Sequence, residues 1–325
     1  MDRPDDASDR TLVDVSCPVC GSRENVLYER VPDRFHLEEG DVYRLVRCVG
    51  CDLVFLNPRP AAERFGEFYP ENGYLPFLSA GGRRSLFERA YVVMRDFNNS
   101  WKRRRIEKRA RGRKLLDVGC ATGEFLAEMR RAGWKVLGVE VDAAAAERAR
   151  EAFGLEVVHG RLEDLETGKG PFDVITMWHV VEHVGDPAGI LARARRLLDP
   201  EGLLVVAVPN HDSVDRKAYG RDWIAYDVPR HLQHFTLATL TRLARGAGFE
   251  PAACRSLPID APFNALMSET LRWRRVEAGP LRKAAGLAAA AGVAMRSLVA
   301  GARGAGWGEE FGASTLLTFW NLQRD

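Results

Sequence analysis

The sequence predicts an α/β fold with a parallel sheet that is covered by helices on both faces. The main support is a rhythm that begins at Lys114, where short apolar runs alternate with helical stretches as far as residue 257. A second observation is the segment LLDVGCATGEF (115–125), in which an apolar run leads through a glycine-punctuated turn into a helix. Four cysteines in two pairs ahead of this region predict a small additional module.

The predicted strands are short apolar runs bounded by turn-forming residues. In chain order they are KLLDVG (114–119), KVLGVEV (135–141), LEVVHG (155–160), FDVITMWHV (172–180), GLLVVAVPN (202–210), FEPAACRSL (249–257) and STLLTFWNL (314–322). The helices between them have recognisable ends. Asp142 and Thr236 suit N-caps, Pro187 suits a first helical position, and Gly133 suits a helix stop.

Composition divides the chain into five segments. They are a polar tail expected to be disordered (1–16), a cysteine-containing β module (17–58), a helical linker or lid (59–112), the α/β domain (113–257 and 311–325) and a helical insertion before the last strand (258–310).

The overall composition is that of an ordinary globular protein. The chain has 325 residues, 46% of them hydrophobic and 28% charged, and its net charge of +2 gives no general attraction to nucleic acid or membrane. Its polar, acidic start does not resemble a signal peptide, and no run of 18 apolar residues is free of charge. We therefore expect a cytoplasmic protein with reduced thiols.

The two cysteine pairs have the same C-x-x-C spacing. They are Cys17 with Cys20 and Cys48 with Cys51. Zinc takes four thiolates in a tetrahedron, and two such turns brought together by a hairpin complete that shell. Four unrelated buried cysteines, or a redox pair, are the alternatives, although neither pair opens a helix after a strand. A closed four-thiolate site leaves no open position, so we expect this zinc to be structural.

The glycine turn suggests which cofactor the α/β domain binds. Gly119 and Gly123 flank Ala121, a spacing that departs from the G-x-G-x-x-G of nicotinamide-binding turns. Asp117 precedes the turn, where a carboxylate would repel a pyrophosphate and attract an ammonium group. Glu140 ends the next strand, where an acid can accept both ribose hydroxyls. S-adenosylmethionine meets both demands; alternatively, Asp117 is a turn acid and Glu140 a solvated strand end.

At this point the chain resembles the class I S-adenosylmethionine-dependent methyltransferases, over residues 113–257 and the last strand. The glycine turn, VVHGRLEDL (157–165), FDVITMWHVVEHVGDP (172–187) and RLLDPEGLLVVAVPN (196–210) resemble four of their motifs in order. The resemblance implies a Rossmann-like, seven-stranded sheet. It also implies cofactor contacts from Asp117, Gly119, Cys120, Ala121, Gly123, Glu140, Val141, Leu162, Glu163, Trp178 and His179.

The segment HVVEH contains three candidate functional residues: His179, Glu182 and His183. It matches a metalloprotease pattern, but that pattern needs both histidines on one helix, whereas a buried strand ends here. A similar EH segment occurs in ubiquinone-type O-methyltransferases, some of which bind a metal there, although His179 stands where they tend to have an acid. Either histidine can act as a general base; alternatively, His183 caps or packs the loop.

A second dense cluster, WIAYDVPRHLQHFT (223–236), follows the strand 202–210 and so lies at the same edge of the sheet. Its candidate catalytic residues are Tyr226 and His231. Similar PRH…HFT segments occur in methyltransferases that carry a zinc ribbon. In the alternative interpretation, Arg230 and the histidines brace the loop against Asp227 and carbonyl groups.

The combination of a four-cysteine module with this domain resembles sugar C-methyltransferases and related bacterial tailoring enzymes. We therefore expect a small-molecule acceptor, a sugar or a lipid-linked intermediate. The basic run Lys102–Lys114 and the zinc module leave RNA methylation as an alternative, with nucleic acid disfavoured by the near-neutral charge. A non-catalytic binding module is another alternative. The apolar stretch 281–303 has basic flanks, which suits peripheral membrane contact, a lid or a packing helix.

Overall fold

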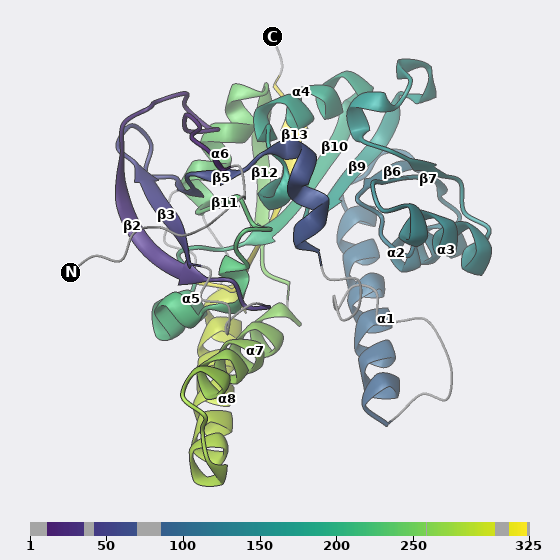
Figure 1. Ribbon diagram of the computed structural model, residues 1–325. Helices are drawn as coiled ribbons and strands as arrows, with labels where there is room; N and C mark the ends of the chain where they lie inside the picture. Colours follow the sequence, from purple (N-terminus) through teal and green to yellow (C-terminus); the bar gives the residue numbers. More distant parts are fainter. Residues whose placement is uncertain (1–11, 36–41, 70–85, 258, 303–311, 324–325) are drawn as a thin grey trace.

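The computed structural model describes residues 12–35, 42–69, 86–257, 259–302 and 312–323. The predicted α/β fold is confirmed (Figure 1). A seven-stranded sheet has the order β12-β13-β10-β9-β6-β7-β8. Its strands are β6 (Lys114–Val118), β7 (Lys135–Glu140), β8 (Val157–His159), β9 (Phe172–Trp178), β10 (Leu198–Pro209), β12 (Phe249–Arg255) and β13 (Thr315–Leu322).

One strand of this sheet departs from the parallel arrangement. β13 is antiparallel to both β10 and β12, because it begins beside the end of β10, with Thr315 opposite Pro209. The other adjacent pairs are parallel, so β6, β7, β9 and β10 end at one edge of the sheet. Ligands of open parallel sheets bind outside that carboxyl edge.

Helices cover both faces of the sheet (Figure 1). On one face lie α4 (Pro187–Leu197) and α6 (Leu237–Gly246), and on the other α1 (Leu86–Glu107), α2 (Glu124–Arg131) and α3 (Ala143–Phe153). Neighbouring residues of one strand supply the two cores, since Leu116 packs with the α4 side and Leu115 with the α2 side. The expected N-caps form, with the Asp142 side chain accepting from the Ala145 amide at 2.7 Å.

The cysteine-containing module shares a sheet with the α/β domain. Strands β2 (Asn25–Pro32), β3 (Val42–Cys48) and β4 (Val54–Leu56) form an antiparallel sheet, and β11 (Gln233–His234) pairs with β4. β11 lies within the predicted PRH…HFT segment. The fourth strand of the module's sheet therefore comes from the part of the chain that carries His231.

Two short strands revise the expected boundaries at the start of the chain. β1 (Leu12–Val13) pairs with β5 (Arg59–Pro60), so the last part of the tail 1–16 is ordered, whereas residues 1–11 lie outside the described part. The linker 59–112 is mostly helical where the structure describes it, apart from β5 and the residues after Glu107. It contains the 3-10 segment Ala62–Phe68 and then α1, and residues 70–85 lie outside the described ranges.

The insertion 258–310 is a helical hairpin, as predicted, in its described part. α7 (Asp260–Arg275) and α8 (Pro280–Ala302) lie side by side and extend away from the sheet (Figure 1). The two helices approach closely at Gly286, where an added Cβ would lie 2.5 Å from Trp273 Nε1. Helix α5 (Val214–Tyr219), which the sequence analysis did not predict, packs against both. Short 3-10 segments lie at Leu162–Asp164, Thr167–Lys169, Val181–His183, Gly220–Asp222 and Ile224–Tyr226.

Candidate active site at the carboxyl edge of the sheet

The glycine turn between β6 and α2 is held in a left-handed conformation. Gly119, Ala121 and Gly123 have φ angles of 68°, 47° and 84°. A Cβ on Gly119 would lie 2.7 Å from Val180 Cγ2, and one on Gly123 would lie 2.6 Å from Leu155 Cδ1. Both glycines are therefore required by backbone angle and by packing, while Ala121 accepts a positive φ with a small side chain.

Asp117 is a buried carboxyl group at the end of β6, with 2% of its surface exposed. Thr176 donates to its Oδ1 at 2.6 Å. Burial raises the pKa of Asp117 to about 7, although the Thr176 hydrogen bond and the Lys102 ammonium oppose the shift. A carboxylate in this position is stabilised by a cationic ligand, because burial has removed most of its water.

Glu140 ties the end of β7 to the glycine turn. Its Oε2 accepts from the Ala121 amide at 2.8 Å, and its Oε1 accepts from the Asp142 amide at 2.9 Å. The side chain is 7% exposed, and burial raises its pKa. Glu140 is therefore not a solvated strand end. Each carboxylate oxygen keeps acceptor capacity beyond these bonds, so the group can still accept from a ligand hydroxyl.

The other predicted cofactor contacts lie around this turn with different exposures. Leu162 is buried, whereas Glu163 and Val141 are exposed, Val141 to 63%. The Cys120 thiol is buried against β7, where a Cβ on Gly138 would meet its sulfur at 2.6 Å. Cys120 can therefore contribute to a ligand site through its backbone rather than its thiol.

Trp178 ends β9 and forms one wall beside the turn. Its ring packs edge to face on Phe125 of α2, with centroids 5.2 Å apart. Lys102 of α1 places its Nζ 4.1 Å from the centroid of the Trp178 ring. Burial lowers the pKa of Lys102, while Asp260 and Asp117 oppose that shift. The first residue of the predicted basic run thus faces the candidate site instead of bulk solvent.

His179 follows β9 and lies between two carboxyl groups. Its Nδ1 is 3.2 Å from Glu182 Oε1 and its Nε2 is 3.3 Å from Asp260 Oδ2. Burial opposes protonation, but the two carboxylates outweigh it and raise the pKa of His179 to about 10. A ring that is protonated at neutral pH does not suit the role of general base, for which the sequence makes His179 one candidate.

His183 and His231 meet edge to face, with ring centroids 4.5 Å apart. Nδ1 of His231 donates to the Ala225 carbonyl oxygen at 2.8 Å. Nδ1 of His183 lies 3.0 Å from the Arg230 carbonyl oxygen and 3.0 Å from the Tyr69 hydroxyl. Because a carbonyl oxygen can only accept, both rings carry their proton on Nδ1 and keep a lone pair on Nε2.

The electrostatics of this histidine pair favour the neutral form. Burial lowers the pKa of His183, and it lowers the pKa of His231 well below 6.5. Asp227 Oδ2 lies 3.9 Å from His231 Nε2, where it can stabilise a proton that the ring receives. The pair therefore offers two unprotonated nitrogens at neutral pH, one of them with a carboxylate close by.

Tyr226 is placed away from this histidine pair. It is buried in an aromatic cluster, 5.2 Å from Trp223 and 5.1 Å from His234 between ring centroids. Its hydroxyl lies 3.4 Å from His211 Nε2. The structure therefore gives Tyr226 a packing position and places Tyr69 beside His183 instead.

A buried ion-pair network holds the loop that carries His231. The Arg230 guanidinium contacts Asp33 at 2.6 Å and Asp227 at 2.8 Å, with its side chain fully buried. It also donates to the Phe68 carbonyl oxygen at 2.9 Å. Arg34 contacts Asp227 at 2.7 Å. The bracing role that we considered for Arg230 is therefore present, and its partners come from the cysteine-containing module and the segment after it.

Two groups of side chains have the geometry of potential metal ligands among the described residues. Ligand atoms of Cys17, Cys20, Cys48 and Cys51 lie within 4.8 Å of one another, and so do those of Glu182, His183 and His231. In the first group, the sulfur atoms of Cys17 and Cys51 are 3.5 Å apart and those of Cys20 and Cys48 3.4 Å. A tetrahedral zinc site would place sulfurs about 3.8 Å apart, so the four thiols fit zinc.

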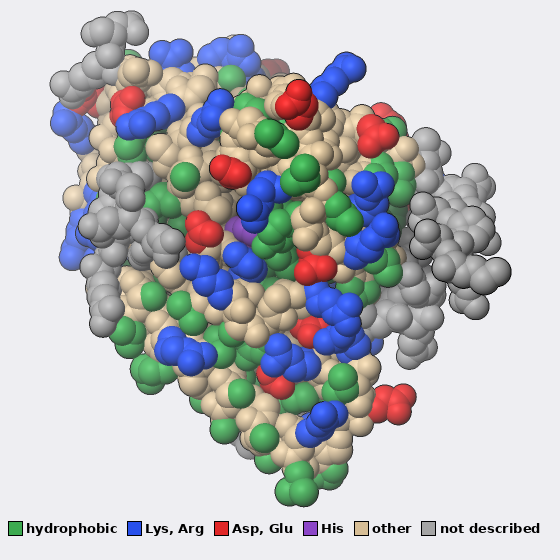
Figure 2. All heavy atoms as spheres, turned by 90° about the vertical axis from the view of Figure 1, so that its left-hand side faces the viewer, with side chains coloured by type: hydrophobic (Ala, Val, Ile, Leu, Met, Phe, Trp, Pro, Cys, Tyr) green, Lys and Arg blue, Asp and Glu red, His purple; other side chains and the backbone are tan. Residues whose placement is uncertain are grey.

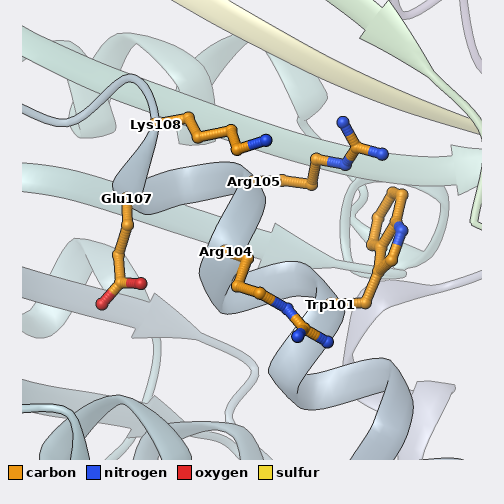
Figure 3. Close-up of a pocket in the computed structure, with 5 residues that line it drawn as sticks. All are labelled: Trp101, Arg104, Arg105, Glu107 and Lys108. Carbon is orange, nitrogen blue, oxygen red and sulfur yellow. The ribbon is translucent and has the colours of Figure 1, made fainter.

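A surface hollow on α1 is separate from these groups. It is lined by Trp101, Arg104, Arg105, Glu107 and Lys108 (Figure 3). Part of the basic run is paired within the chain, since Arg103 contacts Glu107 at 2.7 Å and Glu128 at 2.9 Å. None of the candidate site residues lines this hollow, and nothing in its geometry assigns it a ligand.

Three residues of the site could not be predicted from the sequence. Tyr69 touches His183, Asp260 touches His179, and Lys102 stacks on Trp178. Tyr69 and Asp260 lie outside the segments that resemble methyltransferase motifs, and Lys102 lies in a run with the pattern of a solvated helix. No local signal marks them, because their proximity to the site depends on tertiary packing.

The stability of the fold should depend on pH through His211. Burial lowers its pKa to about 3, and Arg216 and Arg47 act in the same direction. Below pH 6.5 His211 binds a proton in the unfolded chain but not in the folded chain. The free energy of unfolding therefore falls as the pH falls towards 3. We expect His211→Gln to reduce this slope by up to about 1.4 kcal/mol per pH unit. Urea unfolding of both proteins at pH 6.5 and 4.5 measures how the free energy of unfolding changes with pH. The same change in the wild type and in His211→Gln would contradict this role of His211.

Comparison with known proteins agrees with the motifs at this edge. A family model described as a methyltransferase domain matches residues 88–253, just over half of the chain. The chain therefore belongs to this methyltransferase-domain family. It is 31% identical over 162 residues to a probable S-adenosylmethionine-dependent methyltransferase of Mycolicibacterium smegmatis, a match that covers 47% of this chain and 60% of that relative.

A second relative is the ubiquinone biosynthesis O-methyltransferase of Maricaulis maris, 29% identical over 174 residues. That match covers 50% of this chain and 67% of the relative. Among solved structures, an S-adenosylmethionine-dependent methyltransferase of Thermotoga maritima has 26% identity and a TM-score of 0.44, covering 52% of this chain and 79% of that one. The magnesium protoporphyrin IX methyltransferase of Synechocystis with bound SAH has 14% identity and a TM-score of 0.46, covering 58% and 89%.

Proposed function

We propose that this chain transfers a methyl group from S-adenosylmethionine to a small-molecule acceptor. Membership of the methyltransferase-domain family supports the reaction class. The observation that carries the cofactor assignment is the pair of buried carboxyl groups, Asp117 and Glu140, on either side of a left-handed glycine turn. S-adenosylmethionine has an ammonium group and ribose hydroxyls but no phosphate, which suits an acidic edge.

The residues present fit this cofactor in three respects. Asp117 is a buried carboxyl group with no cation in contact distance among the described side chains, so it suits the ammonium group. Glu140 suits the ribose hydroxyls, since each of its oxygens has acceptor capacity left. Trp178, with Phe125 and Lys102 packed against it, forms an aromatic wall beside the glycine turn that suits contact with the cofactor.

When bound, the cofactor supplies an electrophilic methyl group on a sulfonium sulfur. The protein's task is to hold the acceptor in line with that methyl group and to remove the acceptor's proton. We assign proton removal to His231, whose Nε2 carries a lone pair, and charge stabilisation to Asp227, 3.9 Å from that nitrogen. His183 and Tyr69, hydrogen-bonded to each other, would orient the acceptor.

We propose a small molecule with an ionisable proton on its nucleophilic atom as the acceptor. A histidine base is of use only for such an atom, and the relatives named for ubiquinone biosynthesis are O-methyltransferases. The experiment is incubation of the protein with methyl-labelled S-adenosylmethionine and fractionated bacterial extracts. Label in the small-molecule or lipid fraction is the expected result, whereas label in RNA alone would support the alternative that used the basic run.

We propose that the four cysteines hold a structural zinc ion. Their thiols converge within 4.8 Å, and a shell of four thiolates leaves no position for a substrate. In this role the zinc stabilises the sheet β2-β3-β4, and through β4 it supports β11. No step of the proposed reaction uses this ion.

Replacing Asp117 with asparagine should weaken S-adenosylmethionine binding about 10- to 100-fold, because a charge-assisted contact to the ammonium group is lost. Thr176 can still donate to the amide oxygen, so the fold should persist. Asp173→Asn is a matched control at the opposite end of the strands, where Asp173 accepts from the Lys114 amide. Isothermal calorimetry measures both affinities, and an unchanged affinity in Asp117→Asn would contradict the assignment.

A further inference from the structure

The outer face of helix α8 is apolar and exposed. Within the described residues, α8 is the helix that is long and apolar enough to cross a membrane by length and composition, and 28% of its most apolar 18-residue window is buried. The side of α8 that packs on α7 and α5 is buried, and most of its residues are small: Gly286, Ala290, Val293, Ala294 and Ser297. Several larger apolar side chains of the helix are exposed on its other side, whereas Val293 is buried and Leu298 is half-buried.

Four of these outward side chains are large. Leu281 is 89% exposed, Met295 61%, Leu287 50% and Val299 43%. Leu287, Met295 and Val299 are eight and four positions apart, so they lie along one stripe of the helix. α7 and the turn after it add Phe263, Leu266 and Val276, each between 38% and 44% exposed. Exposed apolar side chains gathered on two neighbouring helices mark a contact surface.

The charges around this patch have a single sign on α8. From Ala278 to Ala302 the sequence contains Arg282, Lys283 and Arg296 but no aspartate or glutamate. Figure 2 shows hydrophobic and Lys or Arg side chains, with a few Asp or Glu side chains, over the tapering lower end of the molecule, where Figure 1 places α7 and α8. Arg272 and Arg275 on α7 form ion pairs with Asp222. Arg282 and Lys283, at the start of α8, are exposed to solvent.

We propose that the α7–α8 hairpin binds the surface of an anionic lipid membrane, with the stripe of α8 in the interface and Arg282 and Lys283 against the headgroups. Apolar area and basic residues together are what peripheral helices use to bind such surfaces. A spanning role does not fit, because the inner face of α8 packs on α7 and α5.

A second copy of this chain is a poorer occupant of the same face. A two-fold symmetric dimer places the same patch on both sides of the interface. The α8 part of the patch supplies three cations and no carboxylate, so its charges would find no partners there. An anionic lipid surface supplies what the patch lacks.

The hairpin also connects this surface to the candidate active site. α7 begins at Asp260, which lies 3.3 Å from His179 Nε2. If the proposed methyl transfer is correct, the contact would place the site near acceptors dissolved in the membrane. The lipid contact itself does not depend on the reaction, so the two proposals can fail separately.

The test is co-sedimentation of the full chain with phosphatidylcholine vesicles that contain or lack phosphatidylglycerol, at low and high salt. We expect binding to the anionic vesicles, weakened by salt and absent with phosphatidylcholine alone. Arg282→Gln with Lys283→Gln should weaken it about tenfold or more, and Leu287→Glu with Met295→Glu should abolish it. Val93→Glu replaces an apolar residue on α1 that is at least as exposed and should have no effect.

Two results would overturn the proposal. One is no binding of the wild-type chain to anionic vesicles, or binding that the Leu287→Glu, Met295→Glu variant retains. The other is concentration-dependent dimerisation, seen by light scattering, that the same variant removes, because a second copy would then be the occupant. An unchanged melting temperature in every variant shows that the fold is intact.

Discussion

Substituting asparagine for His231 is expected to lower the rate of methyl transfer by about 100- to 10,000-fold while leaving the affinity for S-adenosylmethionine unchanged. The reason is that Nε2 of His231 carries the lone pair that accepts the acceptor's proton. An asparagine amide can still donate to the Ala225 carbonyl oxygen in place of Nδ1, so the loop should keep its shape. The loss should therefore fall on the chemical step rather than on binding.

His234→Asn is the matched control for this variant, because His234 is a buried histidine of the same segment that faces the aromatic cluster. Initial rates with the labelled acceptor fraction, together with calorimetry, separate turnover from cofactor affinity. A His231→Asn protein that turns over at the wild-type rate would contradict the assignment. Turnover lost on mild EDTA treatment, with the four-cysteine zinc retained, would instead assign Glu182, His183 and His231 to a metal.

Removal of the proposed zinc ion should destabilise the protein by about 5 kcal/mol and abolish turnover. Zinc binding by such modules is largely folding free energy, and here the module is continuous with the site. β4 pairs with β11, and the Leu56 amide donates to the Leu232 carbonyl oxygen at 2.9 Å, next to His231. Loss of β4 would therefore release the loop that holds the proposed base.

The measurement is zinc content, melting temperature and turnover of Cys48→Ser beside the wild-type chain. We expect a stoichiometric zinc ion in the wild type, its loss in the variant, and a melting temperature lower by about 10 °C or more. Cys254→Ser is the control, since Cys254 is buried but does not belong to the four-cysteine group. Full activity in a zinc-free protein would refute the structural role.

Much of the fold could be predicted because its signals are local. The apolar run 114–118 is buried on both faces of a strand, and the caps at Asp142 and Thr236 form as predicted. The two carboxyl groups at the ligand edge follow from the same pattern. Asp117 and Glu140 each end a strand of a parallel sheet, and neighbouring strands place them beside one turn.

The rest depends on contacts between distant parts of the chain. The pairing of β11 with β4 joins residues about 180 positions apart, and no periodic pattern in the sequence predicts it. Tyr226 is a residue type that can act in catalysis, but its ring packs in an aromatic cluster, whereas Tyr69 contacts His183 from outside the segments that resemble methyltransferase motifs. His179 follows strand β9 as predicted, but the two carboxylates beside it favour the protonated ring, which cannot act as a base.

The most direct test of the account is a calorimetric titration of the purified chain with S-adenosylmethionine and S-adenosylhomocysteine, with NAD as the control ligand. The account predicts binding of the first two with one site per chain and no binding of NAD, because the acidic edge formed by Asp117 and Glu140 repels a pyrophosphate. Binding of NAD, or of none of the three, would contradict the cofactor assignment on which the proposed methyl transfer depends.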